Sequence, residues 1–196
     1  MFNIYPCAAN CGRTAVSGSR FCALHAASAE EEAQRIGTLI LEQERIKDLN
    51  AAALTFTNAD FSNKTFYGCN FMGSVFSNCL FSHSTMRMCF FDNSNFKDCD
   101  FSGSDLQFLS FAVTTIANCS FKNSELVHLN YGGSDITDTI FDDSNLYNSR
   151  FINTNVINTS FIDCNLKNVF FVNSRQEGIS FKSSNTAEAI FEVEEL

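Results

Sequence analysis

Residues 91–111 read FDNSNFKDCDFSGSDLQFLSF, and a large apolar side chain stands at every fifth position: Phe91, Phe96, Phe101, Leu106 and Phe111. The same spacing runs without insertion or deletion from Phe56 to Phe191, and it is broken only at Gln176 and Thr186. An α-helix has a period near 3.6 residues and a β-strand a period of 2. A period of five therefore indicates a repeated supersecondary unit.

Two further positions of the five-residue unit are restricted. The residue two before the large one is small, as at Cys69, Ser74, Cys79, Ser84 and Cys89. Large and small residues that alternate toward one interior suit a narrow, interdigitated core. The residue two after the large one is mostly Asn, Gly or Asp, which tolerate turn and left-handed backbone conformations. The sequence thus predicts a corner every five residues.

Four corners close a square coil, so residues twenty apart should stack on one another. Two columns of the sequence support this expectation: Phe61, Phe81, Phe101, Phe121, Phe141, Phe161, Phe181, and Phe71, Phe91, Phe111, Tyr131, Phe151, Phe171, Phe191. At the strand spacing near 4.8 Å, about seven such coils make a rod roughly 34 Å long.

The units SNFKD, CDFSG, SDLQF, SNLYN and CNLKN resemble the motif of the pentapeptide-repeat family, in which a small residue, Asp or Asn, and Leu or Phe are followed by two variable residues. The resemblance covers roughly residues 54 to 193. It implies a right-handed, quadrilateral β-helix, an all-β solenoid with the large and the small residue both inside. A disordered tract rich in Ser and Asn is the alternative, but disordered segments do not hold aromatic residues in phase.

Residues 1–27 contain Cys7, Cys11, Cys22 and His25 in the pattern C-x3-C-x10-C-x2-H. Two close pairs of such ligands suit tetrahedral zinc, and a segment this short needs a metal to fold. The stretch is similar to small zinc-knuckle or treble-clef modules. Because four protein ligands leave no open coordination position, the predicted zinc is structural. The alternative is four reduced side chains without metal.

The other six cysteines occupy the small inward position: Cys69, Cys79, Cys89, Cys99, Cys119 and Cys164. We interpret them as small buried apolar residues. Cys79, Cys99 and Cys119 also stack, so a disulfide between neighbours is the alternative.

Residues 28–53 predict an amphipathic helix. Ser28 followed by Glu31 has the spacing of a capping box. We expect the helix to run from Ala29 to near Leu49 or Ala53, with an apolar stripe at Ile36, Leu39, Ile40, Ile46 and Leu49. The stripe should cover the first coil of the rod around Leu54 and Phe56, because repeat rods need covered ends. Self-association as a short coiled coil is the alternative.

One side of the rod, which we call the apolar side, is built on Phe71, Phe91, Phe111, Tyr131, Phe151, Phe171 and Phe191. Its outward positions, together with those that continue the belt around one coil, supply the predicted partner contacts: Met72, Phe90, Ile152, Ile157, Ile162, Phe170, Val172 and Ile190. Phe108 and Val113 form a smaller patch. Exposed apolar strips of this kind often mark contacts with another chain, and the alternative is scattered surface residues without a role. The other chain could be a second copy. We expect such a homodimer to form through this side, through the 28–53 helix or through the uncapped last coil.

The composition restricts the function. With 22 acidic and 13 basic residues the chain carries a net charge of −9, which argues against direct nucleic-acid or anionic-membrane binding. The start lacks the pattern of a signal peptide, and no stretch reaches the length of a membrane span, so we expect a cytoplasmic protein. Outside the predicted zinc module, His83 and His128 lack a nucleophile and an acid at suitable spacing, so we do not expect an enzyme.

The sequence therefore predicts a non-catalytic interaction or scaffold protein whose partner is another protein. One alternative is an adaptor whose zinc module contacts nucleic acid or a partner. Another comes from the family resemblance, which implies acidic rods that imitate DNA and occupy a type II topoisomerase such as gyrase. Residues 54–196 carry 16 acidic and 8 basic residues, 8 − 16 = −8 in net charge. Duplex DNA of about 34 Å carries roughly 20 negative phosphate charges. The net charge of the rod is thus less than half that of DNA of the same length.

Overall fold

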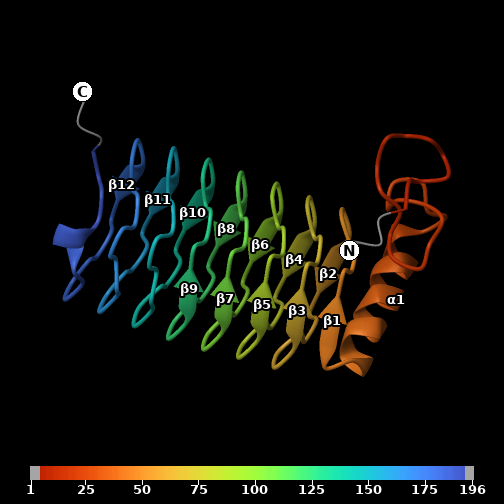
Figure 1. The fold of residues 1–196 in the computed structure, drawn as a ribbon, viewed down its shortest axis with the longest axis horizontal. Coiled ribbons are helices and arrows are strands. Elements are labelled where there is room, and N and C mark those ends of the chain that lie inside the picture. The colour runs from red at the N-terminus through yellow and green to blue at the C-terminus, as the bar shows by residue number, and fades with distance from the viewer. Residues whose placement is uncertain (1–4, 193–196) are drawn as a thin grey trace.

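The computed structural model describes residues 5–192, which form a stack of coils closed at one end by a helix and a small N-terminal head (Figure 1). Helix α1 spans Ala29–Glu42 and a short 3-10 helix, η1, spans Thr186–Glu188. The strands have three residues each: β1 Arg45–Lys47, β2 Thr55–Thr57, β3 Thr65–Tyr67, β4 Val75–Ser77, β5 Thr85–Arg87, β6 Asn95–Lys97, β7 Asp105–Gln107, β8 Thr115–Ala117, β9 Glu125–Val127, β10 Asp135–Thr137, β11 Asn155–Ile157 and β12 Arg175–Glu177.

The corners come every five residues, as predicted. Every fifth residue from Asp48 to Ser183 has a positive φ, and the side chain at this position is mostly Asn, Asp or Gly. The exceptions are Ala53, His83, Met88, Phe108, Val113, His128 and Ser183. A left-handed conformation costs an ordinary L-residue about 1–2 kcal/mol, whereas Gly and, in part, Asn and Asp avoid this cost. The Asn, Asp and Gly pattern is therefore a requirement of the backbone.

The coils pair in parallel with a register of twenty residues, which confirms the predicted stacking. One side of the rod is a five-stranded sheet in the order β1-β3-β5-β7-β9, and another is a seven-stranded sheet in the order β12-β11-β10-β8-β6-β4-β2. The remaining two sides hold single-residue parallel bridges such as Asn70 to Phe90 and Leu80 to Asp100. About seven coils result, an all-β solenoid of the predicted class.

The core consists of columns of aromatic rings. Phe101 lies over Phe121 with ring centroids 4.7 Å apart and planes 4° from parallel, and it lies 4.6 Å from Phe81 on the other side. Adjacent columns meet edge to face, as between Phe101 and Phe111 at 6.3 Å and 89°. Offset stacks and edge-to-face contacts are the two favoured arrangements of aromatic pairs, so one coil geometry satisfies both at once.

The small inward residues donate hydrogen bonds to backbone carbonyls of the preceding coil. The Ser74 hydroxyl donates to the carbonyl of Ala51 at 3.0 Å, and the Ser104 hydroxyl donates to the carbonyl of Phe81 at 2.8 Å. The six cysteines at equivalent positions are buried, as expected, and all nine cysteines are unpaired. The alternative of a disulfide in the Cys79, Cys99 and Cys119 column is therefore not realised.

The predicted end of the helix was wrong. Helix α1 stops at Glu42 instead of continuing to Leu49 or Ala53, and Arg45–Lys47 already forms β1. The reason is visible in the five-residue spacing, which continues backward from Phe56 through Ala51 to Ile46, both buried in the first coil. Lys64 fixes the end of the helix, since its ammonium donates to the carbonyls of Leu41 at 2.8 Å and Gln43 at 2.9 Å.

Helix α1 covers the first coil, as predicted. Ser28 caps its N-terminus by accepting a hydrogen bond from the Glu31 N–H at 3.1 Å. Ile36 and Ile40 are fully buried and join the core of the rod beside β2. At the other end, β12 is exposed along its length and η1 closes the last described coil. Within residues 5–192, none of the helices has the length and apolarity that a membrane span needs.

Candidate metal centre and interaction surface

The head folds through short-range backbone pairing. The Cys7 N–H donates to the carbonyl of Arg13, and the Ala8 N–H donates to the carbonyl of Arg20, both at 2.9 Å. This pairing brings the segment that carries Cys7 and Cys11 beside the one that carries Cys22. A turn in which the His25 N–H donates to the carbonyl of Cys22 at 3.0 Å then places the imidazole on the same side.

All four predicted ligands meet at one point. The three sulfur atoms and a ring nitrogen of His25 lie within 4.8 Å of one another. Cys11 Sγ is 3.8 Å from Cys22 Sγ, and His25 Nδ1 is 3.6 Å from Cys7 Sγ and 3.5 Å from Cys22 Sγ. Zinc bonds of about 2.3 Å to sulfur and about 2.1 Å to nitrogen in a tetrahedron give edges of roughly 3.8 Å and 3.6 Å. These three distances match that tetrahedron.

The electrostatics of the cluster also suit a cation. The Cys22 N–H donates to Cys7 Sγ at 3.3 Å, and this bond is the main cause that lowers the pKa of Cys7 to about 6. A backbone hydrogen bond from Arg13 lowers the pKa of Cys11, whereas burial raises that of Cys22. A hydrogen bond with Cys7 raises the pKa of His25. A metal would take over the role of these contacts by binding the thiolates directly.

The head is joined to the rod by Asn50, which is only 4% exposed. Its side-chain NH₂ donates to the Thr14 hydroxyl at 3.0 Å and to the carbonyl of Ala15 at 2.5 Å. Its backbone exchanges two hydrogen bonds with Ser17, each 2.8 Å long. Its side-chain oxygen accepts from Asn70 in the next coil at 2.8 Å. The head therefore sits on the first coil through a satisfied polar joint.

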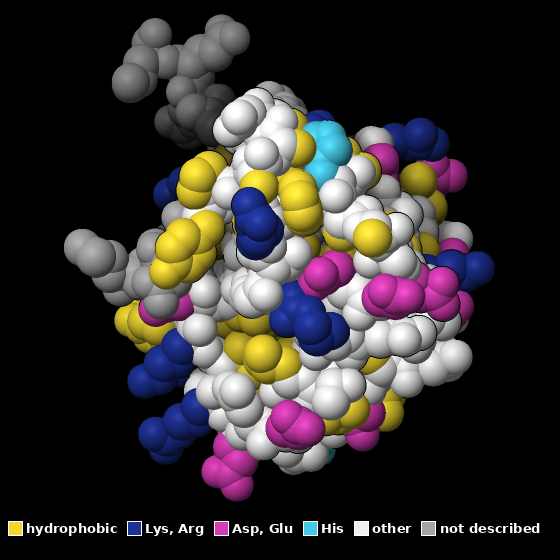
Figure 2. Space-filling model, turned by 90° about the vertical axis from the view of Figure 1, so that its right-hand side faces the viewer, with side chains coloured by type: hydrophobic (Ala, Val, Ile, Leu, Met, Phe, Trp, Pro, Cys, Tyr) yellow, Lys and Arg dark blue, Asp and Glu magenta, His cyan; other side chains and the backbone are white. Residues whose placement is uncertain are grey.

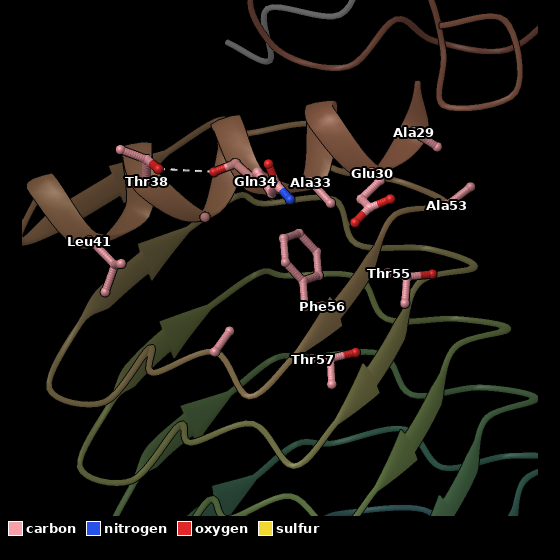
Figure 3. Close-up of a pocket in the computed structure, with 12 residues that line it drawn as sticks. Ala29, Glu30, Ala33, Gln34, Thr38, Leu41, Ala53, Thr55, Phe56 and Thr57 are labelled. Atoms are coloured by element: carbon pink, nitrogen blue, oxygen red, sulfur yellow. Dashed lines mark hydrogen bonds between the residues drawn. The ribbon is translucent and has the colours of Figure 1, made fainter. Parts of the chain in front are cut away.

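A groove of about 640 Å³ lies between α1 and the edge strand β2 (Figure 3). Ala33 and other small residues of the helix leave this space, and Phe56 points into it from the strand. Among its lining residues Glu30 is the one that is charged. The groove lacks the paired titratable groups that an active site uses. It is present because the cylindrical helix contacts the flat face of the first coil over only part of its width.

The predicted partner contacts fall into two groups. Met72 and Phe90 are exposed by 40% and 39%. The others are half-buried: Ile152, Ile157, Ile162, Phe170, Val172 and Ile190. Six of the eight lie on the apolar side, whereas Ile157 belongs to β11 on the next side and Ile162 to the side after it. Ile157 and Ile162 thus continue the belt around one coil, outside the strip. The strip also carries Arg150, whose guanidinium lies 5.9 Å from the ring of Phe170.

Exposed apolar side chains also stand at three corners of the rod. Among the residues described in the rod, Val113 and Phe108 are the most exposed large apolar side chains, at 61% and 54%, and Met88 follows the same pattern at 43%. All three stand at left-handed positions, where Asn, Asp or Gly is the rule. The sequence predicted a patch at Phe108 and Val113, and the same departure from the pattern would have added Met88.

A quadrilateral β-helix wound in five-residue sides defines the structural class. Family models agree with it, since the model of pentapeptide repeats matches in eight copies over residues 53–87, 74–107 and 139–175. The β-helix of this chain belongs to the pentapeptide-repeat family. The head lies outside the matched residues.

One solved structure supports the fold, and a second is reported beside it. A trypsin-treated variant of QnrB1, a plasmid-mediated fluoroquinolone resistance protein, matches with a TM-score of 0.55 and 18% identity over 75% of this chain and 76% of that chain. HetL from Nostoc sp. strain PCC 7120, a pentapeptide-repeat protein involved in heterocyst differentiation regulation, matches with a TM-score of 0.35 and 11% identity over 82% of this chain and 96% of that one. None of the curated proteins compared matches the chain.

Proposed function

We propose that the chain is a non-catalytic scaffold that binds other proteins through the sides of its β-helix, with a zinc-stabilised head as a rigid cap. The observation that carries this proposal is the unbroken ladder of hydrogen bonds between coils. Each coil donates both backward and forward, as where the Val75 N–H donates to Leu54 and the Asn78 N–H donates to Lys97, both at 2.9 Å. Such a rod presents flat sides of fixed spacing, which suits binding more than turnover.

The histidines of the rod support a role without catalysis. His128 stacks on Phe108 with ring centroids 4.8 Å apart, and its Nδ1 lies 2.6 Å from the amide nitrogen of Asn148. His83 stands at a corner beside Gly103 of the next coil, where a Cβ would come within 2.6 Å of its ring. Both rings thus serve packing between coils, and neither forms a nucleophile and base pair with a neighbour in the described residues.

Zinc in the head is the second part of the proposal. The donor set of three cysteines and one histidine, and the match of three of its distances to a zinc tetrahedron, favour Zn²⁺ in a structural role. Elemental analysis of the purified full-length protein tests it. We expect about one zinc per chain, and we expect the Cys22→Ser variant to lose it. A wild-type protein free of zinc after purification without chelator would contradict this part.

Mimicry of DNA toward a type II topoisomerase is less well supported by the surface. Several carboxylates are engaged by neighbours along the rod: Lys122 lies 3.4 Å from Asp143, and Asn118 donates to Asp98 at 2.6 Å. Viewed from the capped end, the surface mixes both signs of charge with apolar side chains (Figure 2). A gyrase supercoiling assay separates the two functions. A scaffold leaves gyrase active at about 10 µM protein, whereas a mimic inhibits it or protects it from drugs.

The scaffold proposal is tested by chemical crosslinking and mass spectrometry of the intact chain recovered from its native cells. We expect crosslinks from a co-purifying protein to map to Lys97, Lys122, Lys167 or Lys182 on the rod. A matched sample that is denatured before crosslinking controls for nonspecific capture. Turnover of a small molecule by the purified protein would refute the proposal.

A further inference from the structure

The apolar side combines a protrusion and a depression in adjacent coils. Val113, which we call the knob, stands at a corner of one coil. Gly133, which we call the hollow, lies in the next coil directly below Val113, since the Val113 N–H donates to the carbonyl of Gly132 at 2.9 Å. A Cβ built on Gly133 would lie 3.6 Å from Cγ2 of Val113. The knob therefore overhangs bare backbone.

The knob is costly for the isolated chain. Val113 has a φ of 57°, a conformation that β-branched residues avoid. Its side chain is 61% exposed and gains little packing in return. Asn occupies the same corner two coils later, at Asn153, and avoids this strain. Backbone strain that the monomer does not need points to a contact made elsewhere.

The charges of the apolar side select a neutral occupant. Its outward positions from Asn70 to Val172 carry one acid, Asp92, and one base, Arg150, although the whole chain has a net charge of −9. Asp92 is held in place, since it accepts hydrogen bonds from the Ser110 hydroxyl and from the Ala112 N–H. Two copies that repel each other elsewhere can thus meet here without a charge penalty.

The two features are arranged to complement themselves. A two-fold axis that lies across the rod between the knob and the hollow leaves every column facing its own copy and reverses the order of the coils. Val113 then faces Gly133 of the second copy, and Phe90 faces Arg150 of the second copy, where a cation–π contact forms. Further along the same side, Met72 faces Val172 of the second copy. Each contact occurs twice, as an isologous interface requires.

We propose that the apolar side is the interface of an antiparallel, side-by-side homodimer in which the knob of each copy enters the hollow of the other. This goes beyond the scaffold function, because it assigns one side of the rod to self-association and leaves the other three for partners. It also makes the predicted contacts Met72, Phe90 and Val172 part of one surface.

Sedimentation equilibrium of the full-length protein tests the proposal. We expect a concentration-dependent rise from the 21.8 kDa of one chain to twice that mass. The Val113→Asn variant should weaken dimerisation at least tenfold. Because Asn accepts the left-handed conformation, the same variant should raise Tm by about 2 °C when measured below the dimerisation range. A residue that only serves packing would instead lower Tm.

Two further variants distinguish this interface from other ways to dimerise. Gly133→Asn fills the hollow with a residue that the column already accepts at Asn153, so it should also weaken the dimer. Ser183→Asn relieves the same kind of corner on another side and should leave dimerisation unchanged. A wild-type protein that stays at the mass of one chain up to about 500 µM would overturn the proposal. So would a dimer that Val113→Asn and Gly133→Asn leave intact.

Discussion

The head and the β-helix are stabilised in different ways. The head buries mainly small side chains, such as Ala15, Val16 and Ala23, and draws its ligand atoms to one point. The β-helix buries columns of Phe, and its coils repeat the same contacts. One chain thus combines a head whose fold depends on four metal-ligand atoms with a β-helix whose fold depends on many equivalent coils. Damage to one should therefore spread little to the other.

The largest effect should follow metal removal. Structural zinc supplies about 10–16 kcal/mol of apparent binding free energy to small modules, so the head should unfold when Cys22→Ser or a strong chelator removes the metal. Far-ultraviolet circular dichroism should stay close to that of the wild type, because the rod keeps its own core. Ser19→Ala, an exchange in the same loop away from the cluster, is the control. A variant that loses its β-sheet signal as well would show that the two regions fold as one.

Phe121→Ala tests the opposite region. Phe121 is fully buried between Phe101 and Phe141, with ring centroids 4.7 Å and 5.0 Å away. The cavity should lower the free energy of unfolding by about 3–5 kcal/mol while the zinc content stays unchanged. Denaturant titration and elemental analysis measure both.

The matched control is Phe191→Ala at the end of the rod. Phe191 is half-buried and stacks on one side only among the described residues, on Phe171 at 5.3 Å. Its loss should cost well under half as much as that of Phe121. Equal losses at the two positions would contradict a core built from layers.

Asn50→Ala probes the joint between the two regions. The change leaves the carbonyl of Ala15 and the side-chain amide of Asn70 without their partner, and unsatisfied buried groups cost about 1–3 kcal/mol. Hydrogen exchange should rise in the head and the first coil and stay unchanged beyond Phe121. Asn95→Ala, at an exposed position of β6 with an extended backbone, controls for the loss of an amide.

The smallest effect should be a gain. The Tyr131 hydroxyl is buried and has no hydrogen-bond partner among the residues described, and burial raises its pKa, so it stays neutral. Tyr131→Phe restores the ring that the column carries in its other coils and should stabilise the rod by about 1 kcal/mol. Thermal unfolding measures it. A destabilised variant would mean that the hydroxyl has a partner in solution.

The rod was predictable in detail because each five-residue side repeats the same pattern. A large inward residue, a small inward residue and a corner residue of one type recur in each side, so local and global preferences agree. The columns that contain Phe101 and Phe121 follow from counting. The four ligands of the head were also readable, since their spacing carries the chemistry.

The start of the rod and the strained corners were harder to predict. Ile46 suits both a helical stripe and a five-residue column, and tertiary packing decided in favour of the column. The joint at Asn50 depends on contacts between segments that are far apart in the sequence. Phe108 and Val113 break the corner rule, and the sequence marks them as an apolar patch without indicating what they contact. Such departures occur where a chain gives up local preference for a contact elsewhere.

The twenty-residue register of the coils determines which insertions this molecule can accept in evolution. A duplication of twenty residues would lengthen the rod by one layer of about 4.8 Å and leave all four sides aligned. An insertion of five residues would keep every ring inside, but it would turn everything downstream by a quarter revolution. A binding surface that runs along one side would then be cut in two without any loss of fold. Insertions of twenty residues thus change the length of the rod alone, whereas insertions of five residues change the orientation of its sides.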